Sequence, residues 1–229
     1  MKILITILTI CMAITLVANK DKNVTETKIN NLTKGVENNK INDNKVDELL
    51  AKIKTSYENV KVLEAEFEQE FFHKAYKRKK NSSGSVIFTN DLKMKWSYKS
   101  PEEKYIISNG NLLWIYEPEN EQAFKTDIKD SELESAAKFL LGKMDVLKKY
   151  NLELKADTLT LTPKVEGNYK KIYLRFNSDF RIVETKMIDN FNNENVIKYK
   201  KFKLNKFKLT KEFFDFIPPD GIDIIEKDK

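Results

Sequence analysis

Side chains that could catalyse a reaction or hold a metal are few in this chain of 229 residues. His73 is the one histidine and Cys11 the one cysteine, so neither a Ser-His-Asp set with a spare histidine nor a zinc site of the usual ligand types can be assembled. The six glycines are dispersed along the chain and form no phosphate-binding loop. These residue types therefore predict neither a metal nor a cofactor.

Carboxylates are plentiful, and four of them alternate along the segment VLEAEFEQEFF at 62–72. Because side chains alternate across a strand, the four glutamates share one face; they are Glu64, Glu66, Glu68 and Glu70. Glutamates opposite an apolar face are typical of the solvent-exposed side of a sheet, so we do not predict an enzyme. The alternative, an enzyme that uses these carboxylates, requires a carboxylate pair inside an apolar pocket.

The elements that must position these side chains are mostly strands. The segment LKMKWSYK at 92–99 alternates apolar and polar residues, and turn signals such as Asn109-Gly110 separate the strand-like runs that follow. Those runs lie at 103–108, 111–116, 122–127, 151–155, 158–162, 170–176, 181–188 and 196–204. About eleven short strands in meander order predict a curled antiparallel sheet with one exposed and one buried face.

Two helices are expected beside the sheet. Apolar residues recur every three or four positions from Val46 to Val60, after the cap region Asn42-Asp43-Asn44. A capping box at Ser131–Glu134 precedes the second helix, which carries three consecutive large apolar residues at 139–141. This helix either plugs the end of a barrel or packs one face on the sheet and turns another toward a cavity.

The N-terminal region predicts export. Residues 1–18 have a basic start, Met1-Lys2, and an apolar run that is shorter than the roughly 20 residues a membrane span needs, so we interpret them as a cleaved signal peptide. An uncleaved anchor is one alternative. Lipidation at Cys11 is another, which the bulky Ile10 before it disfavours. Residues 19–44, rich in Asn and Lys, are predicted to be a flexible tether, and the folded domain is expected at 45–229.

The charge pattern argues against nucleic-acid binding. The net charge is +6, but the 41 basic residues are interleaved with 35 acidic ones, and only the block Lys74–Lys80 is strongly basic. A solvated hairpin connection explains that block, and attraction to anionic headgroups or an acidic partner is the alternative. The 14 phenylalanines indicate either a well-filled core or an apolar surface for a ligand.

An ordered series of motifs resembles the periplasmic outer-membrane lipoprotein carrier family, LolA. The motifs are FEQEF at 67–71, GSVIF at 84–88, MKWSYKSP at 94–101, SNGNLLWIYEPENEQ at 108–122, LTLTPK at 159–164 and FIPPDGIDI at 216–224. The resemblance implies a mainly β fold, an unclosed antiparallel barrel lidded by an N-terminal helix and a central helical insertion. It implies a monomeric, non-enzymatic periplasmic chaperone that takes lipoproteins by their acyl chains from an inner-membrane ABC transporter and delivers them to an outer-membrane acceptor.

The resemblance also implies which residues meet the acyl chains. The expected lipid-binding residues are Phe67, Met94, Trp96, Ile107, Leu113, Trp114, Phe139 and Leu140. Asn90 stands where the family often has an arginine that ties the lid to the barrel, and Met94 stands where phenylalanine is frequent. Alternation alone does not decide which of these residues face lipid and which, such as Phe67, Trp96 and Trp114, are ordinary core.

Two other functions fit the same fold. An outer-membrane-anchored acceptor of lipoproteins would require modification of Cys11. An envelope lipid- or lipoprotein-sensing domain would require a second domain. We prefer the soluble carrier.

Overall fold

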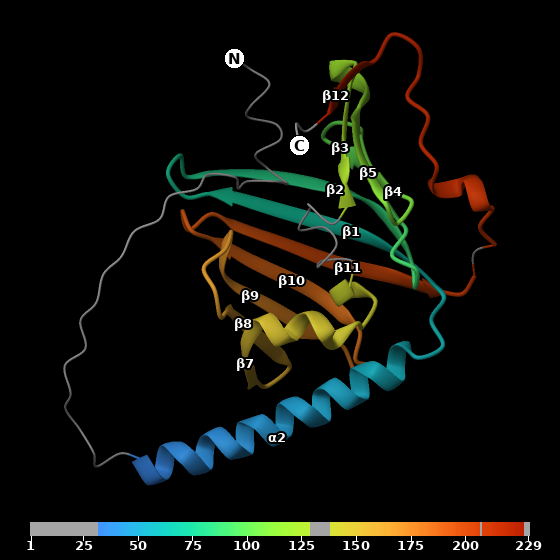
Figure 1. Cartoon of the computed structure of the whole chain (residues 1–229). Helices are drawn as coiled ribbons and strands as arrows, with labels where there is room; N and C mark the ends of the chain where they lie inside the picture. Colours follow the sequence, from blue (N-terminus) through green and yellow to red (C-terminus); the bar gives the residue numbers. More distant parts are fainter. Residues whose placement is uncertain (1–31, 129–137, 207, 227–229) are drawn as a thin grey trace.

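The computed structural model describes residues 32–128, 138–206 and 208–226 (Figure 1). The predicted signal peptide, residues 19–31 of the predicted tether and the capping box at 131–134 lie outside these residues. No helix within the described part of the chain is both long and apolar enough to cross a membrane.

A single sheet of twelve strands dominates the molecule. The first six strands are β1 (Val62–His73), β2 (Arg78–Thr89), β3 (Met94–Ser100), β4 (Lys104–Ser108), β5 (Leu112–Glu117) and β6 (Gln122–Asp127). The others are β7 (Tyr150–Lys155), β8 (Thr158–Pro163), β9 (Tyr169–Phe176), β10 (Ile182–Asp189), β11 (Glu194–Leu204) and β12 (Asp223–Glu226). The predicted fold class, an unclosed antiparallel β-barrel with helices, is confirmed.

The strand order is β12-β6-β5-β4-β3-β2-β1-β11-β10-β9-β8-β7. Two meanders, β1 to β6 and β7 to β11, therefore join where β11 pairs with β1. The chain passes from one edge of the sheet to the other between β6 and β7, through a helical stretch at 138–140 and the 3-10 helix η3 (Met144–Lys149). β12 pairs with β6 in parallel, and the period-two pattern did not predict this strand.

The alternating glutamates of β1 lie on the outer face of the sheet. Lysines of β11 pair with three of them: Lys200 pairs with Glu68, Lys201 Nζ lies 3.0 Å from Glu66 Oε1, and Lys203 Nζ lies 3.1 Å from Glu64 Oε1. The inward positions of the same strand, including Phe67, are buried. Exposed ion pairs of this kind contribute little to stability, about 0–1 kcal/mol each, and mark the solvent side of the sheet.

The N-terminal helix α2 spans Leu32–Tyr57 and lies along the β7 side of the sheet (Figure 1). It begins before Asn42, where we expected its cap, so the backbone of the last part of the predicted tether is helical. The reason is that Asn is only a weak helix former and does not stop a helix as proline does. Ile53 of α2 is fully buried in the core cluster beneath the sheet.

After β11 the chain returns along the outer face to reach β12. This return includes the 3-10 helix η4 (Lys211–Phe214) and places Phe216 against the outer face of β5. Its ring centroid lies 5.5 Å from that of Trp114 and 5.1 Å from that of Tyr116. The β4–β5 hairpin therefore has apolar neighbours on both of its faces.

Candidate functional site

A cavity of about 640 Å³ lies on the concave side of the sheet. Strands β3 and β4 and the central insertion contribute Trp96, Ile106, Phe139 and Leu140 to its lining, and strands β9 to β11 contribute Ile172, Leu174, Met187, Ile197 and Tyr199. Its size falls in the range of about 300–1,000 Å³ that is usual for ligand pockets. The residues that line it are largely apolar.

Strand register brings these side chains onto one face. Trp96 is the cross-strand partner of Ile106, and across the β1–β11 junction Phe67 is opposite Tyr199 and Gln69 is opposite Ile197. Directly paired residues in an antiparallel sheet point to the same side. The cavity wall is thus continuous across the line where the two meanders meet.

Aromatic contacts support the part of the cavity wall around Trp96. The ring centroid of Phe67 lies 5.1 Å from that of Trp96, in an edge-to-face arrangement. Phe67 can lie there because its partner across the strands is Gly84, where an added Cβ would come within 2.9 Å of Phe67 Cε1 and 2.0 Å of the Ser97 carbonyl oxygen. Edge-to-face pairs stabilise by about 0.5–1.5 kcal/mol each beyond burial, so this part of the wall is held in place.

Three of the polar side chains at the cavity are hydrogen-bonded to one another. Tyr98 Oη donates to Gln69 Oε1 at 3.0 Å, and Gln69 Nε2 donates to Asn195 Oδ1 at 2.8 Å. Burial raises the pKa of the Tyr199 phenol well above its ordinary value, against the lowering effect of its hydrogen bond with Thr185. The phenol is therefore neutral at physiological pH, and these groups offer hydrogen bonds rather than charge. Among the residues described, no group of three His, Cys, Asp or Glu side chains is placed to hold a metal ion.

The structure divides the expected lipid-binding residues into three sets. Trp96, Phe139 and Leu140 line the cavity. Met94 and Leu113 lie on the concave side but are fully buried in the core cluster, and Phe67 packs directly behind Trp96.

Ile107 and Trp114 form the third set and lie on the outer face. They are cross-strand partners, and they point away from the cavity because their strand neighbours Ile106 and Leu113 point toward the concave side. Phe216 covers Trp114 from outside, and Lys125 Nζ lies 5.6 Å from the Trp114 ring centroid. Because both faces of this hairpin carry apolar residues, the sequence did not predict which of them face the cavity.

The insertion contacts the barrel and α2 at the end of the sheet where Asn90 lies. Lys143, from the segment between the two meanders, donates its Nζ–H to the backbone carbonyl of Asn90. Gly142, next to it, has a φ of +66°, and an added Cβ there would lie 2.6 Å from Cδ2 of Tyr57 in α2. The charged donor at this contact thus comes from the insertion rather than from the barrel, where the family often has arginine.

The half of the cavity wall that β9 to β11 supply was not predicted from the sequence. Ile172 and Leu174 alternate with exposed or half-buried residues, as do Ile197 and Tyr199. This signal was present in the period-two pattern, but most of the motifs that resemble the family lie in the first meander. No motif at 170–200 marked these strands as lining a cavity.

A curled, unclosed sheet with helices at one side and an internal apolar cavity is the architecture of a protein that binds an apolar ligand. The sequence matches the family "Outer membrane lipoprotein carrier protein LolA" over residues 58–217, and the chain belongs to this family.

Curated relatives agree with this membership, and a solved structure shares the fold. An outer-membrane lipoprotein carrier protein of Nitrosospira multiformis is 26% identical over 184 residues, which cover 78% of this chain and 88% of the relative. The protein of the same name from Dechloromonas aromatica is 26% identical over 174 residues, 73% of this chain and 82% of the relative. The crystal structure of an uncharacterized conserved protein from Thermus thermophilus shares the fold with a TM-score of 0.51 at 12% identity, covering 80% of this chain and 99% of that one.

Proposed function

We propose that this protein is a periplasmic carrier of lipoproteins, which holds their acyl chains in the concave cavity. The observation that carries the proposal is the apolar cavity of about 640 Å³ inside a chain of the lipoprotein-carrier family. Lipoproteins released by an inner-membrane ABC transporter would be the cargo, and an outer-membrane acceptor would receive them. The protein acts as a chaperone and not as an enzyme.

The energetics of the cavity fit transport. Each methylene removed from water stabilises the complex by about 0.8 kcal/mol, so affinity grows with the length of chain that is buried. A wall of apolar side chains makes many weak contacts and few directional ones. Such binding tolerates different cargo and permits release to an acceptor.

We assign the acyl-chain contacts to Trp96, Phe139 and Leu140 together with Ile197 and Tyr199 of the second meander, because these residues line one continuous cavity. The fully buried residues behind them, including Met94, hold the wall in shape. In this assignment the outer-face pair Ile107–Trp114 does not touch cargo.

The contacts of the insertion with Asn90 and Tyr57 are suited to a lid. Lys143 ties the insertion to the β2–β3 turn through one hydrogen bond to Asn90, and Gly142 lets the insertion pack against Tyr57 of α2. A single exposed hydrogen bond contributes about 1 kcal/mol, which a bound or departing acyl chain can overcome. We assign Asn90 the role of the lid contact on the barrel side.

A release assay tests the function. Purified protein is added to spheroplasts that accumulate outer-membrane lipoproteins, and the supernatant is analysed by size-exclusion chromatography for lipoproteins that co-elute with it. A soluble one-to-one complex supports the carrier role. The Asn151→Glu variant, altered at an exposed position of β7, serves as the control and should release as much as the wild type. If folded protein releases no lipoprotein from membranes that hold the matching transporter, the proposed function is wrong.

A further inference from the structure

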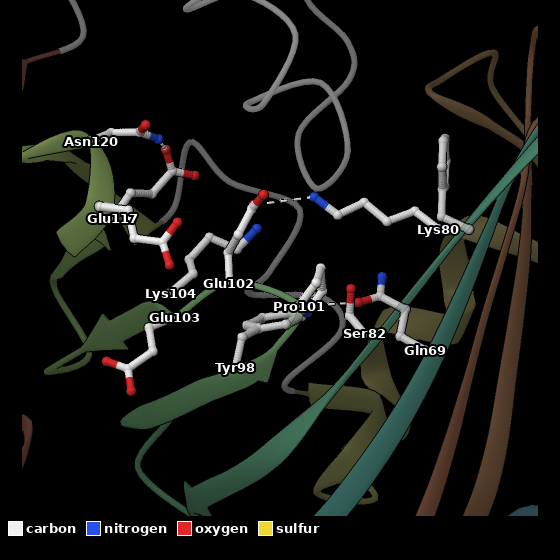
Figure 2. Close-up of a pocket in the computed structure, with 12 residues that line it drawn as sticks. Gln69, Lys80, Ser82, Tyr98, Pro101, Glu102, Glu103, Lys104, Glu117 and Asn120 are labelled. Carbon is white, nitrogen blue, oxygen red and sulfur yellow. Dashed lines mark hydrogen bonds and ion pairs between the residues drawn. The ribbon is translucent and has the colours of Figure 1, made fainter.

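A small polar pocket of about 140 Å³ adjoins the apolar cavity. Gln69 and Tyr98 line both volumes, and the hydrogen bond between them forms the boundary. Figure 2 shows these two side chains on one side of the pocket and Glu117 with Asn120 on the other. The concave surface therefore changes from apolar to polar at one row of side chains.

The strand register places this pocket at the end of the concave surface opposite the lid contact. Gln69 pairs with Ser82, and Tyr98 pairs with Lys104, so these four positions share the concave face. They lie near the β1–β2 and β3–β4 turns, whereas Asn90 lies in the β2–β3 turn at the other end of the same strands. This end of the concave surface thus offers polar groups directly beside the apolar cavity.

The pocket carries more negative than positive groups. Glu102, Glu103, Glu117 and Glu119 line it together with Lys80 and Lys104. Lys80 Nζ is 3.3 Å from Glu102 Oε2, so that lysine is already engaged. Glu117 is only 6% exposed, and Asn120 Nδ2, a neutral donor, lies 2.9 Å from its Oε2. A buried carboxylate with a neutral partner is stabilised by a cation that approaches it.

The lysines at the cavity lie on the other meander. Lys148 and Lys149 precede β7, and Lys164 follows β8. The cavity is thus basic beside β7 and β8, and the adjoining polar pocket is acidic beside β4 and β5. This separation of charge gives a polar headgroup a preferred orientation.

We propose that the polar pocket receives the stretch of cargo polypeptide that directly follows the lipid-bearing residue, and that it prefers a cationic side chain there over an anionic one. This inference rests on the proposed function. Charge complementarity to Glu117 and Glu119 and the shared wall with the cavity are the observations that favour this occupant.

Two synthetic lipopeptides test the preference. Each has a tripalmitoylated cysteine and a serine, followed in one by four lysines and in the other by four glutamates. Their binding to the purified protein is measured by fluorescence anisotropy of a C-terminal dye. We expect the lysine form to bind about fivefold more tightly at low salt, and the difference to shrink in about 1 M NaCl.

Substitutions in the pocket test whether its glutamates cause the preference for the lysine lipopeptide. Glu117→Gln and Glu119→Gln should each reduce it, and the exposed Glu119 keeps the test valid if the buried substitution impairs folding. Glu153→Gln, at an exposed position of β7, is the matched control and should leave it unchanged. Equal binding of the two lipopeptides, or a preference that survives both pocket variants, overturns the inference while the carrier function stands. Binding of neither lipopeptide would instead refute the proposed function itself.

Discussion

Replacing Ile197 by glutamate places a carboxylate in the wall of the cavity. Ile197 is 7% exposed and lies on β11 beside the apolar lining of both meanders. In the empty protein the new carboxylate reaches the cavity and can keep water. When an acyl chain fills that space the carboxylate loses its water, so it must take up a proton.

The size of the effect follows from the pKa of the introduced group. A glutamate has a pKa of about 4.3 in water, and full burial raises it to about 8–9. At a pH of about 7 the cost of protonation is then about 4 kcal/mol, which weakens acyl-chain binding by roughly 500-fold. Because the pKa is raised in the bound state, the loss shrinks as the pH falls, to roughly fivefold at a pH of about 5.

Met94→Glu provides the contrast. Met94 is 0% exposed and has no part in the cavity lining, so its carboxylate is buried whether or not lipid is bound. The same arithmetic lowers the free energy of unfolding by about 4 kcal/mol near pH 7, a large share of the about 5–15 kcal/mol typical of a domain. Stability should therefore fall as the pH rises above about 4.3, where the unfolded chain ionises and the folded one does not.

Two measurements separate these effects. Binding is followed by displacement of a fluorescent fatty acid at several pH values, and stability by urea denaturation, with Ile197→Val as an apolar control that should retain binding. If Ile197→Glu binds as the wild type does, the cavity is not the lipid site. If Met94→Glu is as stable as the wild type and still loses binding, our placement of Met94 in the core is wrong.

Three further predictions concern the contacts of the insertion with the barrel and α2. Lys143→Met removes the hydrogen bond to the Asn90 carbonyl and should speed lipid dissociation in stopped-flow experiments, at a cost of about 1 kcal/mol in stability; an unchanged dissociation rate would rule out a latch there. Gly142 has a φ of +66°, and the Cβ of an alanine there would lie 2.6 Å from the Tyr57 ring, so Gly142→Ala should destabilise the protein by about 1–3 kcal/mol in thermal denaturation. Gly167→Ala adds a Cβ in open space and should leave the stability unchanged. Burial raises the pKa of Tyr57 to about 12, so about 3 kcal/mol of stability should be lost between about pH 10 and 12, and Tyr57→Phe should remove that part of the loss.

Much of the sheet could be predicted because its strands alternate with a period of two. The turn at Asn109-Gly110 and the exposed glutamates of β1 marked strand ends and the outer face from local chemistry alone. Strand β12 could not be found this way, since its pairing with β6 joins segments about a hundred residues apart. The start of α2 was predicted too late because Asn42-Asp43-Asn44 resembles a cap region. These residues do not break a helix, so α2 continues through them from Leu32.

The site residues were harder to predict than the fold. Trp96 and Trp114 are each followed two positions later by a tyrosine, yet one lines the cavity and the other packs against Phe216 on the outer face. Which face an apolar residue occupies depends on what covers each face. For Trp114 the cover comes from the return segment before β12, which the local sequence around the tryptophan does not contain.

The sequence by itself determined the class of fold, the family and the scarcity of catalytic residue types, because these depend on composition, on local periodicity and on an ordered series of short motifs. Only the tertiary structure decided where the cavity lies and which residues form its wall. Its wall joins β3 and β4 with β9 to β11, and the insertion is joined to the barrel by the hydrogen bond from Lys143 to Asn90. A cavity is space left between distant segments, and its boundaries exist only after the chain has folded.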